Sequence, residues 1–126
     1  THCISSAASD VYKRQIKGAG TVVACPDGGW SINRSGGPIL AVAGTGDVLA
    51  GTIAGLLASS VPQGLKDADQ IATVSAELTR LGVWIHGDAG DSLAAQPEWS
   101  ASIGLPAAQL VQAIRIGLNR LAAGRS

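Results

Sequence analysis

Apolar residues recur at helical spacing in three successive segments from residue 47 onward. They stand three or four positions apart, so each segment places them on one face. The pattern predicts three helices, the first from Asp47, the second from Asp67 and the last from Pro106. The apolar positions that define the three faces are Leu49, Ile53, Leu56 and Leu57, then Ile71, Val74, Leu78, Leu81 and Ile85, and finally Leu110, Ile114, Leu118 and Leu121.

Residues at the ends of these segments support the same boundaries. Asp67 and Gln70 stand in a spacing that resembles a capping box, which favours a helix start. Pro106 suits the first turn of the last helix, and Gly124 suits its end. We therefore expect the second helix to begin at Asp67 and the third to end near Gly124.

Glycines interrupt two of the predicted helices. Gly51 and Gly55 each cost about 1 kcal/mol relative to alanine, and the close approach of a neighbouring element or ligand would explain them. Gly87 and Gly90 are expected to weaken or kink the second helix, and residues 96–104 are expected to form a loop.

The region before the first helix has the composition of short strands. Thr21–Cys25 and Trp30–Asn33 flank an Asp-Gly sequence, which is typical of a β-hairpin. Arg34–Pro38 has turn chemistry, and Ile39–Val42 is a short apolar stretch. Short strands or a hairpin followed by three helices do not make a complete sheet layer, so the pattern predicts part of an α/β domain.

Composition narrows the class of partner. The chain has 126 residues, a formal net charge of zero and 14% charged residues, so we expect one domain at most and no footprint for nucleic acid or an anionic membrane. Two cysteines cannot make a disulfide framework, and no apolar run approaches the roughly 20 residues that span a bilayer. A small molecule or a protein is the expected partner, and the expected location is cytoplasmic.

The N-terminal residues look foreign to the rest of the chain. Ser5–Gln15 reads SSAASDVYKRQ, which matches the in-frame translation of a transposon adapter used to prepare sequencing libraries. We therefore expect residues 1–15 to be an adapter artefact with its upstream scar, and to be disordered. Residues 16–126 are then expected to be the C-terminal part of a catalytic domain.

The segment Ala43–Gly51, AGTGDVLAG, has the chemistry of a phosphate site. A glycine-rich turn that leads directly into a helix gathers unpaired backbone N–H groups and the positive end of the helix dipole at one point. Gly44 and Gly46 permit close approach, and Thr45 adds a hydroxyl donor. Gly46 and Gly51 have the glycine spacing of a P-loop, but Thr52 follows where that motif requires lysine. The dinucleotide fingerprint fails because Leu49 stands at its third glycine.

Asp47 follows these residues at the start of the predicted helix. A carboxylate there has the position of a general base beside an anion hole, as phosphoryl transfer to a hydroxyl requires. Aspartate is also a favoured capping residue, so on physical grounds alone capping and catalysis are equally favoured. His86, Asp88 and Asp91 lack the spacing of metal ligands, and we interpret them as structural residues at a helix end.

Several motifs together resemble one family. The sequence AGTGDVLAGTIAGLLA is similar to the signature of the ribokinase-like superfamily, and most closely to that of the NAD(P)H-hydrate dehydratases, with Asp47 at the position of the catalytic aspartate. Lys17–Thr21 resembles the family's KGAGT nucleotide-binding segment. Asn33–Pro38 resembles its N-P-x-G-N-P turn, with Arg34 and Gly37 as departures, and residues 82–91 resemble its G-V-x-x-H-G-x-A-G-D helix.

The resemblance implies a metabolite-repair reaction on a ribokinase-like α/β fold. Hydrated NADH or NADPH is phosphorylated on its hydroxyl by ADP or ATP, and phosphate is then eliminated. On this interpretation Asp47 is the base and contacts the hydrated cofactor. The resemblance also implies Mg²⁺, but the sequence does not identify its ligands. Whether the full-length enzyme forms a homo-oligomer stays open. The anion hole comprises Gly44, Thr45 and Gly46, and the nucleotide contacts comprise Lys17, Gly18, Ala19, Gly20, Thr21 and Gly46.

Two alternatives remain. A small-molecule kinase of the same superfamily, such as a thiazole or hydroxymethylpyrimidine kinase, shares the Gly-Thr-Gly-Asp sequence. An alternative of another class is a non-catalytic fragment that only binds an adenine nucleotide. The KGAGT segment and the helix with HG-x-AGD favour the dehydratase over the kinase.

Overall fold

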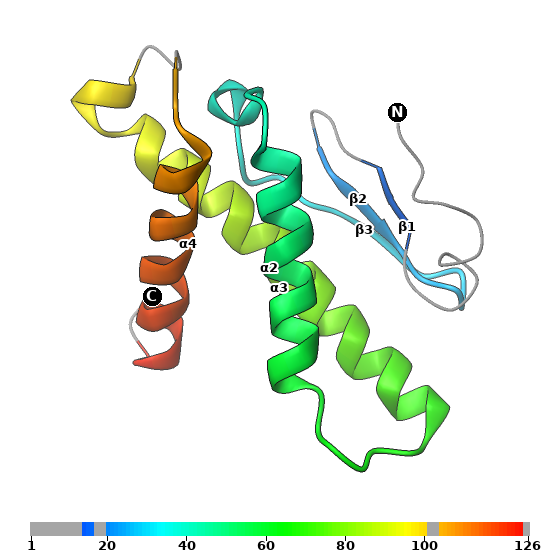
Figure 1. Ribbon diagram of the computed structural model, residues 1–126. Helices are drawn as coiled ribbons and strands as arrows, with labels where there is room; N and C mark the ends of the chain where they lie inside the picture. The colour runs from blue at the N-terminus through cyan, green and yellow to red at the C-terminus, as the bar shows by residue number, and fades with distance from the viewer. Residues whose placement is uncertain (1–13, 17–19, 101–103, 125–126) are drawn as a thin grey trace.

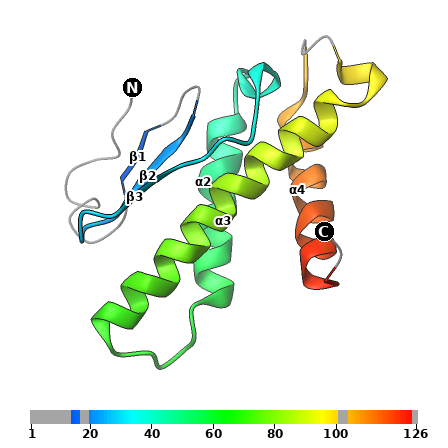
Figure 2. The same cartoon turned by 180° about the vertical axis from the view of Figure 1, so that it is seen from behind.

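The long third helix organises the molecule. The computed structural model describes residues 14–16, 20–100 and 104–124. A small sheet lies on one side of this helix and the last helix on the other, while a further helix packs across it (Figures 1 and 2). The elements in chain order are β1 (Arg14–Ile16), β2 (Val22–Ala24), β3 (Trp30–Ile32), the 3-10 turn η1 (Pro38–Leu40), α2 (Thr45–Ser60), α3 (Ala68–Ala94), the 3-10 turn η2 (Pro97–Trp99) and α4 (Ala107–Ala122).

The sheet is antiparallel in the order β1-β2-β3. The predicted hairpin is confirmed: Val23 pairs with Ser31 across β2 and β3, and Gly28 takes a positive φ of 89° in the turn between them. The third strand, β1, is not predicted by the sequence pattern. It includes the backbone of Arg14 and Gln15, so the disorder expected for residues 1–15 does not extend to these two.

The core lies mostly on the α4 side of α3. One cluster joins η1, α3 and α4, and a smaller cluster of Val23, Leu49 and Val83 joins the sheet, α2 and α3. Burial of these aliphatic side chains is the main favourable contribution to folding. The members of the larger cluster are Ile39, Ile85, Ala89, Leu93, Leu105, Leu110 and Ile114.

Helix α3 is longer and more regular than the sequence predicts. Its predicted start is confirmed, because the Asp67 side chain accepts hydrogen bonds from the backbone N–H groups of Asp69 and Gln70. The predicted weak point at Gly87 and Gly90 is wrong, since the helix continues through both to Ala94. Both glycines are buried against other elements, so tertiary packing outweighs their poor helix propensity. The predicted loop at 96–104 contains η2.

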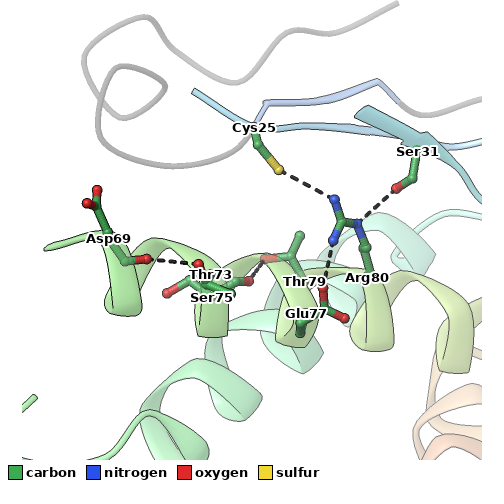
Figure 3. A network of polar contacts seen from close by, with 8 residues as sticks. All are labelled: Cys25, Ser31, Asp69, Thr73, Ser75, Glu77, Thr79 and Arg80. Atoms are coloured by element: carbon green, nitrogen blue, oxygen red, sulfur yellow. Dashed lines mark hydrogen bonds and ion pairs between the residues drawn. The ribbon is translucent and has the colours of Figure 1, made fainter. Parts of the chain in front are cut away.

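A polar network ties the first half of α3 to the hairpin. The Arg80 guanidinium donates to Ser31 Oγ on β3 at 3.3 Å and to Cys25 Sγ beside β2 at 3.9 Å. It also pairs with Glu77 one turn away, at 2.8 Å (Figure 3). Arg80 thus spans the gap between helix and sheet and holds the hairpin in register with α3.

Gly51 and Gly55 do not have the close neighbours that would explain glycine, with its poor helix propensity, at these two positions. Both are exposed on α2, and a Cβ built on either meets no described atom within 4 Å. The expectation of a closely approaching element is therefore wrong among the described residues. Within the same ranges, no helix combines the length and apolar character needed to cross a membrane.

Gly51→Ala is expected to stabilise the 126-residue chain. Alanine at an exposed position inside a helix is favoured over glycine by about 0.8–1 kcal/mol, and open space receives the new methyl group. Urea denaturation checks this as a higher midpoint with an unchanged slope. A lower midpoint would contradict the open space found around Gly51.

Candidate functional site

A cavity of about 500 Å³ lies where the hairpin, the segment after it, the start of α2 and the middle of α3 meet. Its wall is largely apolar and backbone, with a few polar side chains, as is usual for small-molecule sites. Segments far apart in sequence contribute to it. The lining residues are Gly20, Thr21, Asn33, Ser35, Gly36, Gly37, Pro38, Leu40, Ala41, Thr45, Gly46, Leu49, Val83, His86 and Gly87.

The start of α2 forms one end of this cavity. Gly44 is the N-cap, with a φ of 89° that a side chain would make unfavourable, and no side chain caps the helix. The Gly-Thr-Gly sequence therefore turns the chain so that the first N–H groups of α2 face away from the helix body. The predicted glycine turn into a helix is present, and Thr45 and Gly46 line the cavity.

Asp47 lies in the first turn of α2 but is not its cap. The cap position belongs to Gly44, and Asp47 is exposed. No described residue forms a hydrogen bond to its carboxylate. The capping interpretation of Asp47 is thus removed, which leaves its carboxylate available to a ligand next to Gly46.

Thr45 differs from its predicted role in one respect. Its hydroxyl was expected to donate to phosphate, but it lies 2.7 Å from the Leu40 carbonyl oxygen and 2.9 Å from that of Val42. A hydroxyl has a single hydrogen, and here it is shared between two backbone acceptors. The buried Thr45 side chain fastens α2 to η1, and the Thr45 N–H also donates to the Val42 carbonyl oxygen, at 3.4 Å.

A second helix begins beside the first. A Cβ on Gly44 would lie 3.3 Å from Cβ of Ala107, the first residue of α4. Both helices present their positive dipole ends to this region. Helix α4 is capped by Pro106 without a side-chain acceptor. The electrostatic field at the start of α2 therefore favours a negatively charged group more than one helix would.

The segment after the hairpin is held directly against α3. Ser35 Oγ lies 2.9 Å from the Trp84 carbonyl oxygen, and the Gly36 N–H donates to Asp91 Oδ2 at 2.9 Å. Gly87 permits this approach, because a Cβ there would overlap the side chain and backbone of Ser35. The HG-x-AGD sequence of α3 thus supports the segment Ser35–Gly36, which forms one wall of the cavity.

Asp91 lies in the last turn of α3, where its carbonyl oxygen accepts from the N–H of the C-cap residue Ala95. His86 lies two turns before that end, so the helix-end prediction is wrong for His86. His86 is 8% exposed, and its Nε2 lies 2.9 Å from the Thr45 carbonyl oxygen at the start of α2. The contact joins residues 41 positions apart, so no local pattern reveals it. The only signal in the sequence is that His86 stands next to a glycine on the apolar face of a long helix.

The predicted nucleotide segment is described in part. Lys17, Gly18 and Ala19 lie outside the described residues. Gly20 and Thr21 line the cavity, and the Thr21 carbonyl oxygen accepts a hydrogen bond from the Asn33 N–H at 2.8 Å. Gly20 and Thr21 thus share one cavity with Gly46, as the prediction of a common nucleotide site requires.

The described ranges contain no group of three His, Cys, Asp or Glu side chains that would hold a metal ion. The Asp91 carboxylate instead accepts a hydrogen bond from the Gly36 N–H. Thr45 and Gly46 bring the start of α2 to the cavity, whereas Gly44 and the exposed Asp47 are not among its lining residues.

Known proteins similar in sequence to this chain are NAD(P)H-hydrate dehydratases and repair enzymes. The sequence profile of the NAD(P)H-hydrate dehydratases matches residues 7–115, and the chain belongs to this family. It is 48% identical over 81 residues to a bifunctional NAD(P)H-hydrate repair enzyme of Moorella thermoacetica, which covers 64% of this chain and 13% of the relative. It is 38% identical over 106 residues to the ADP-dependent (S)-NAD(P)H-hydrate dehydratase of Neisseria meningitidis, covering 84% and 31%.

Solved structures show the same fold. Bacillus subtilis YxkO superimposes with a TM-score of 0.62 at 29% identity, over 90% of this chain and 37% of that one. The ADP/ATP-dependent NAD(P)H-hydrate dehydratase of B. subtilis, co-crystallised with ATP/Mg²⁺ and soaked with CoA, gives 0.58 at 30% identity, over 83% and 33%. The predicted ribokinase-like α/β fold is confirmed. The chain spans between about an eighth and three eighths of the length of these relatives.

Proposed function

We propose that residues 16–126 are the C-terminal, nucleotide-handling part of an ADP- or ATP-dependent NAD(P)H-hydrate dehydratase. The observation that carries the proposal is the shared cavity: the end of the KGAGT segment and the start of α2 line it together. Membership of the dehydratase family supports the same conclusion. The substrates are hydrated NADH or NADPH and an adenine nucleotide.

The start of α2 suits the transferring phosphoryl group. Backbone N–H groups at a helix N-terminus stabilise phosphate oxygens, and the nearby start of α4 adds to the positive potential. Gly44, Thr45 and Gly46 make up the anion hole of this proposal. The Thr45 hydroxyl is engaged with Leu40 and Val42, and its N–H also donates to the Val42 carbonyl oxygen, so the backbone of the two glycines contributes most. Lys17, Gly18, Ala19, Gly20 and Thr21 bind the nucleotide, and Gly46 assists.

Asp47 is the general base in this proposal. It takes the proton of the substrate hydroxyl while the hydroxyl oxygen forms a bond to the terminal phosphorus of the nucleotide. The bond between that phosphorus and the bridging oxygen breaks, and the nucleotide leaves with one phosphate fewer. Elimination of phosphate from the resulting ester then restores NADH or NADPH.

Mg²⁺ enters the proposal only as the partner of the nucleotide phosphates, as in the ATP/Mg²⁺ complex of the B. subtilis relative. Among the described residues, no group of three His, Cys, Asp or Glu side chains is placed to hold it. A cytoplasmic location and action without nucleic acid or membrane belong to the same proposal. The oligomeric state of the full-length enzyme stays open.

A functional assay separates the dehydratase from its alternatives. The full-length product of the gene is incubated with hydrated NADH and with ADP or ATP, and absorbance at the reduced-nicotinamide band is expected to recover. Absence of recovery with either nucleotide, together with phosphorylation of a thiazole or hydroxymethylpyrimidine alcohol, would establish the kinase instead.

Calorimetry on the 126-residue chain isolates the binding function. Saturable heat on titration with ADP is expected if the cavity binds the nucleotide. If the chain gives saturable heat but the full-length product shows no turnover, the chain is a nucleotide-binding module without catalytic activity. If ADP gives no heat, this chain does not contain the proposed nucleotide site.

A further inference from the structure

We propose that His86 is a positioning residue that fixes the orientation of the Gly46 N–H. The inference rests on the proposed role of Gly46 as an anion-hole donor. It is carried by the 2.9 Å contact between His86 Nε2 and the Thr45 carbonyl oxygen, inside the wall of the cavity.

The contact determines which ring nitrogen bears hydrogen. A carbonyl oxygen only accepts, so Nε2 of His86 carries a proton and donates it. Thr45 is the first residue of α2, where its carbonyl oxygen also accepts from the N–H four residues later in an α-helix. The second lone pair of the oxygen receives His86, so the side chain supports the helix start without replacing a helical hydrogen bond.

Peptide geometry transmits this contact to Gly46. The Thr45 carbonyl and the Gly46 N–H belong to one planar peptide unit and point in opposite directions. Fixing the carbonyl oxygen at His86 therefore fixes the direction of the N–H. Glycines on either side of Thr45 give this part of the backbone more freedom than other residues would, so an external support has a large effect here.

Thr45 is held from two sides. Its hydroxyl shares a hydrogen between the carbonyls of Leu40 and Val42, and its carbonyl accepts from His86. The residue is 6% exposed. A donor that is already oriented avoids reorganisation when negative charge develops, which is how an anion hole lowers an activation barrier.

The first test measures the hydrogen bond in the unchanged chain. Nitrogen-15 spectra of the 126-residue chain are expected to show His86 with hydrogen on Nε2. Hydrogen on Nδ1 alone, with a bare Nε2, would overturn the inference, because such a ring cannot donate to Thr45. This result does not depend on any nucleotide.

The second test uses a conservative pair of variants. Gln places an amide nitrogen close to the position of Nε2, whereas Leu has no donor. His86→Leu is expected to move the Gly46 amide resonance and to lower kcat of the full-length product about 10- to 100-fold, which is less than the full loss of one anion-hole donor. His86→Gln is expected to restore both, with little change in KM.

Thr79→Val is the matched control. Thr79 is also a buried polar residue of α3, but among the described residues its hydroxyl donates to the Ser75 carbonyl oxygen within the same helix. It is expected to change stability without moving the Gly46 resonance. Equal losses in both His86 variants, in proportion to their loss of stability, would assign His86 a merely structural role.

The outcomes also separate this inference from the proposed function. If the Gly46 resonance distinguishes Leu from Gln, yet neither ADP nor ATP shifts it in the unchanged chain, the positioning role stands and the nucleotide site falls. If the nucleotide shifts the resonance equally in all three proteins, the nucleotide site stands and the positioning role falls.

Discussion

Asp47→Asn is expected to abolish most turnover in the full-length product while nucleotide binding is retained. The amide has the shape of the carboxylate but cannot take the proton of the substrate hydroxyl. General-base catalysis contributes about 10²- to 10⁴-fold, and kcat is expected to fall by that factor. Asp47 is exposed and does not cap α2, so the fold depends little on it. Steady-state kinetics give kcat, and calorimetry with ADP gives Kd.

Asp69→Asn provides the matched control for loss of charge. Asp69 is likewise an exposed carboxylate in the first turn of a helix, α3, far along the chain from the cavity lining. Both substitutions remove the same favourable interaction with a helix dipole. If Asp69→Asn and Asp47→Asn reduce kcat alike, or if neither does, Asp47 is not the base.

Local patterns predict the helices of this chain well. The start of α3 at Asp67 follows from a short-range capping interaction, and the hairpin follows from Asp27-Gly28 between two β-branched or aromatic runs. Such features depend on residues two to four positions apart. The sequence therefore contains the information needed to place them.

Contacts between distant segments are not available from these patterns. Gly87 has poor helix propensity, yet it lies inside α3 because Ser35 approaches its backbone. The hydroxyl of Thr45 has the chemistry of a phosphate donor, yet it is directed to Leu40 and Val42. In both cases residue type indicates a site, and only the fold determines which atom faces it.

Family motifs extend the prediction further than physical reasoning does. Glycines and a carboxylate at a helix start leave Asp47 balanced between cap and catalyst, and the resemblance favours catalysis. The structure adds a separate argument, since Gly44 is the cap. It also removes the Thr45 hydroxyl from the predicted phosphate donors, because that hydroxyl is engaged with Leu40 and Val42.

Gly87→Ala is expected to be among the most destabilising single substitutions in this chain. The new Cβ would overlap Ser35, including its backbone carbonyl group, which cannot rotate away as a side chain does. Overpacking of this kind costs about 1–3 kcal/mol and sometimes more, of a total stability of about 5–15 kcal/mol for most domains. We expect a loss of about 3 kcal/mol, measured from the midpoint of urea denaturation.

Gly90→Ala one turn later separates backbone overlap from helix propensity. Its Cβ would lie 2.8 Å from Leu40 Cδ2 and 2.9 Å from Leu40 Cγ, both atoms of a side chain and not of the backbone, so repacking is expected to limit the loss to about 1 kcal/mol. Both substitutions gain the same helix propensity of nearly 1 kcal/mol. If Gly87→Ala is no more destabilising than Gly90→Ala, Ser35 does not rest on Gly87. The cavity wall that begins at Asn33 would then need another support.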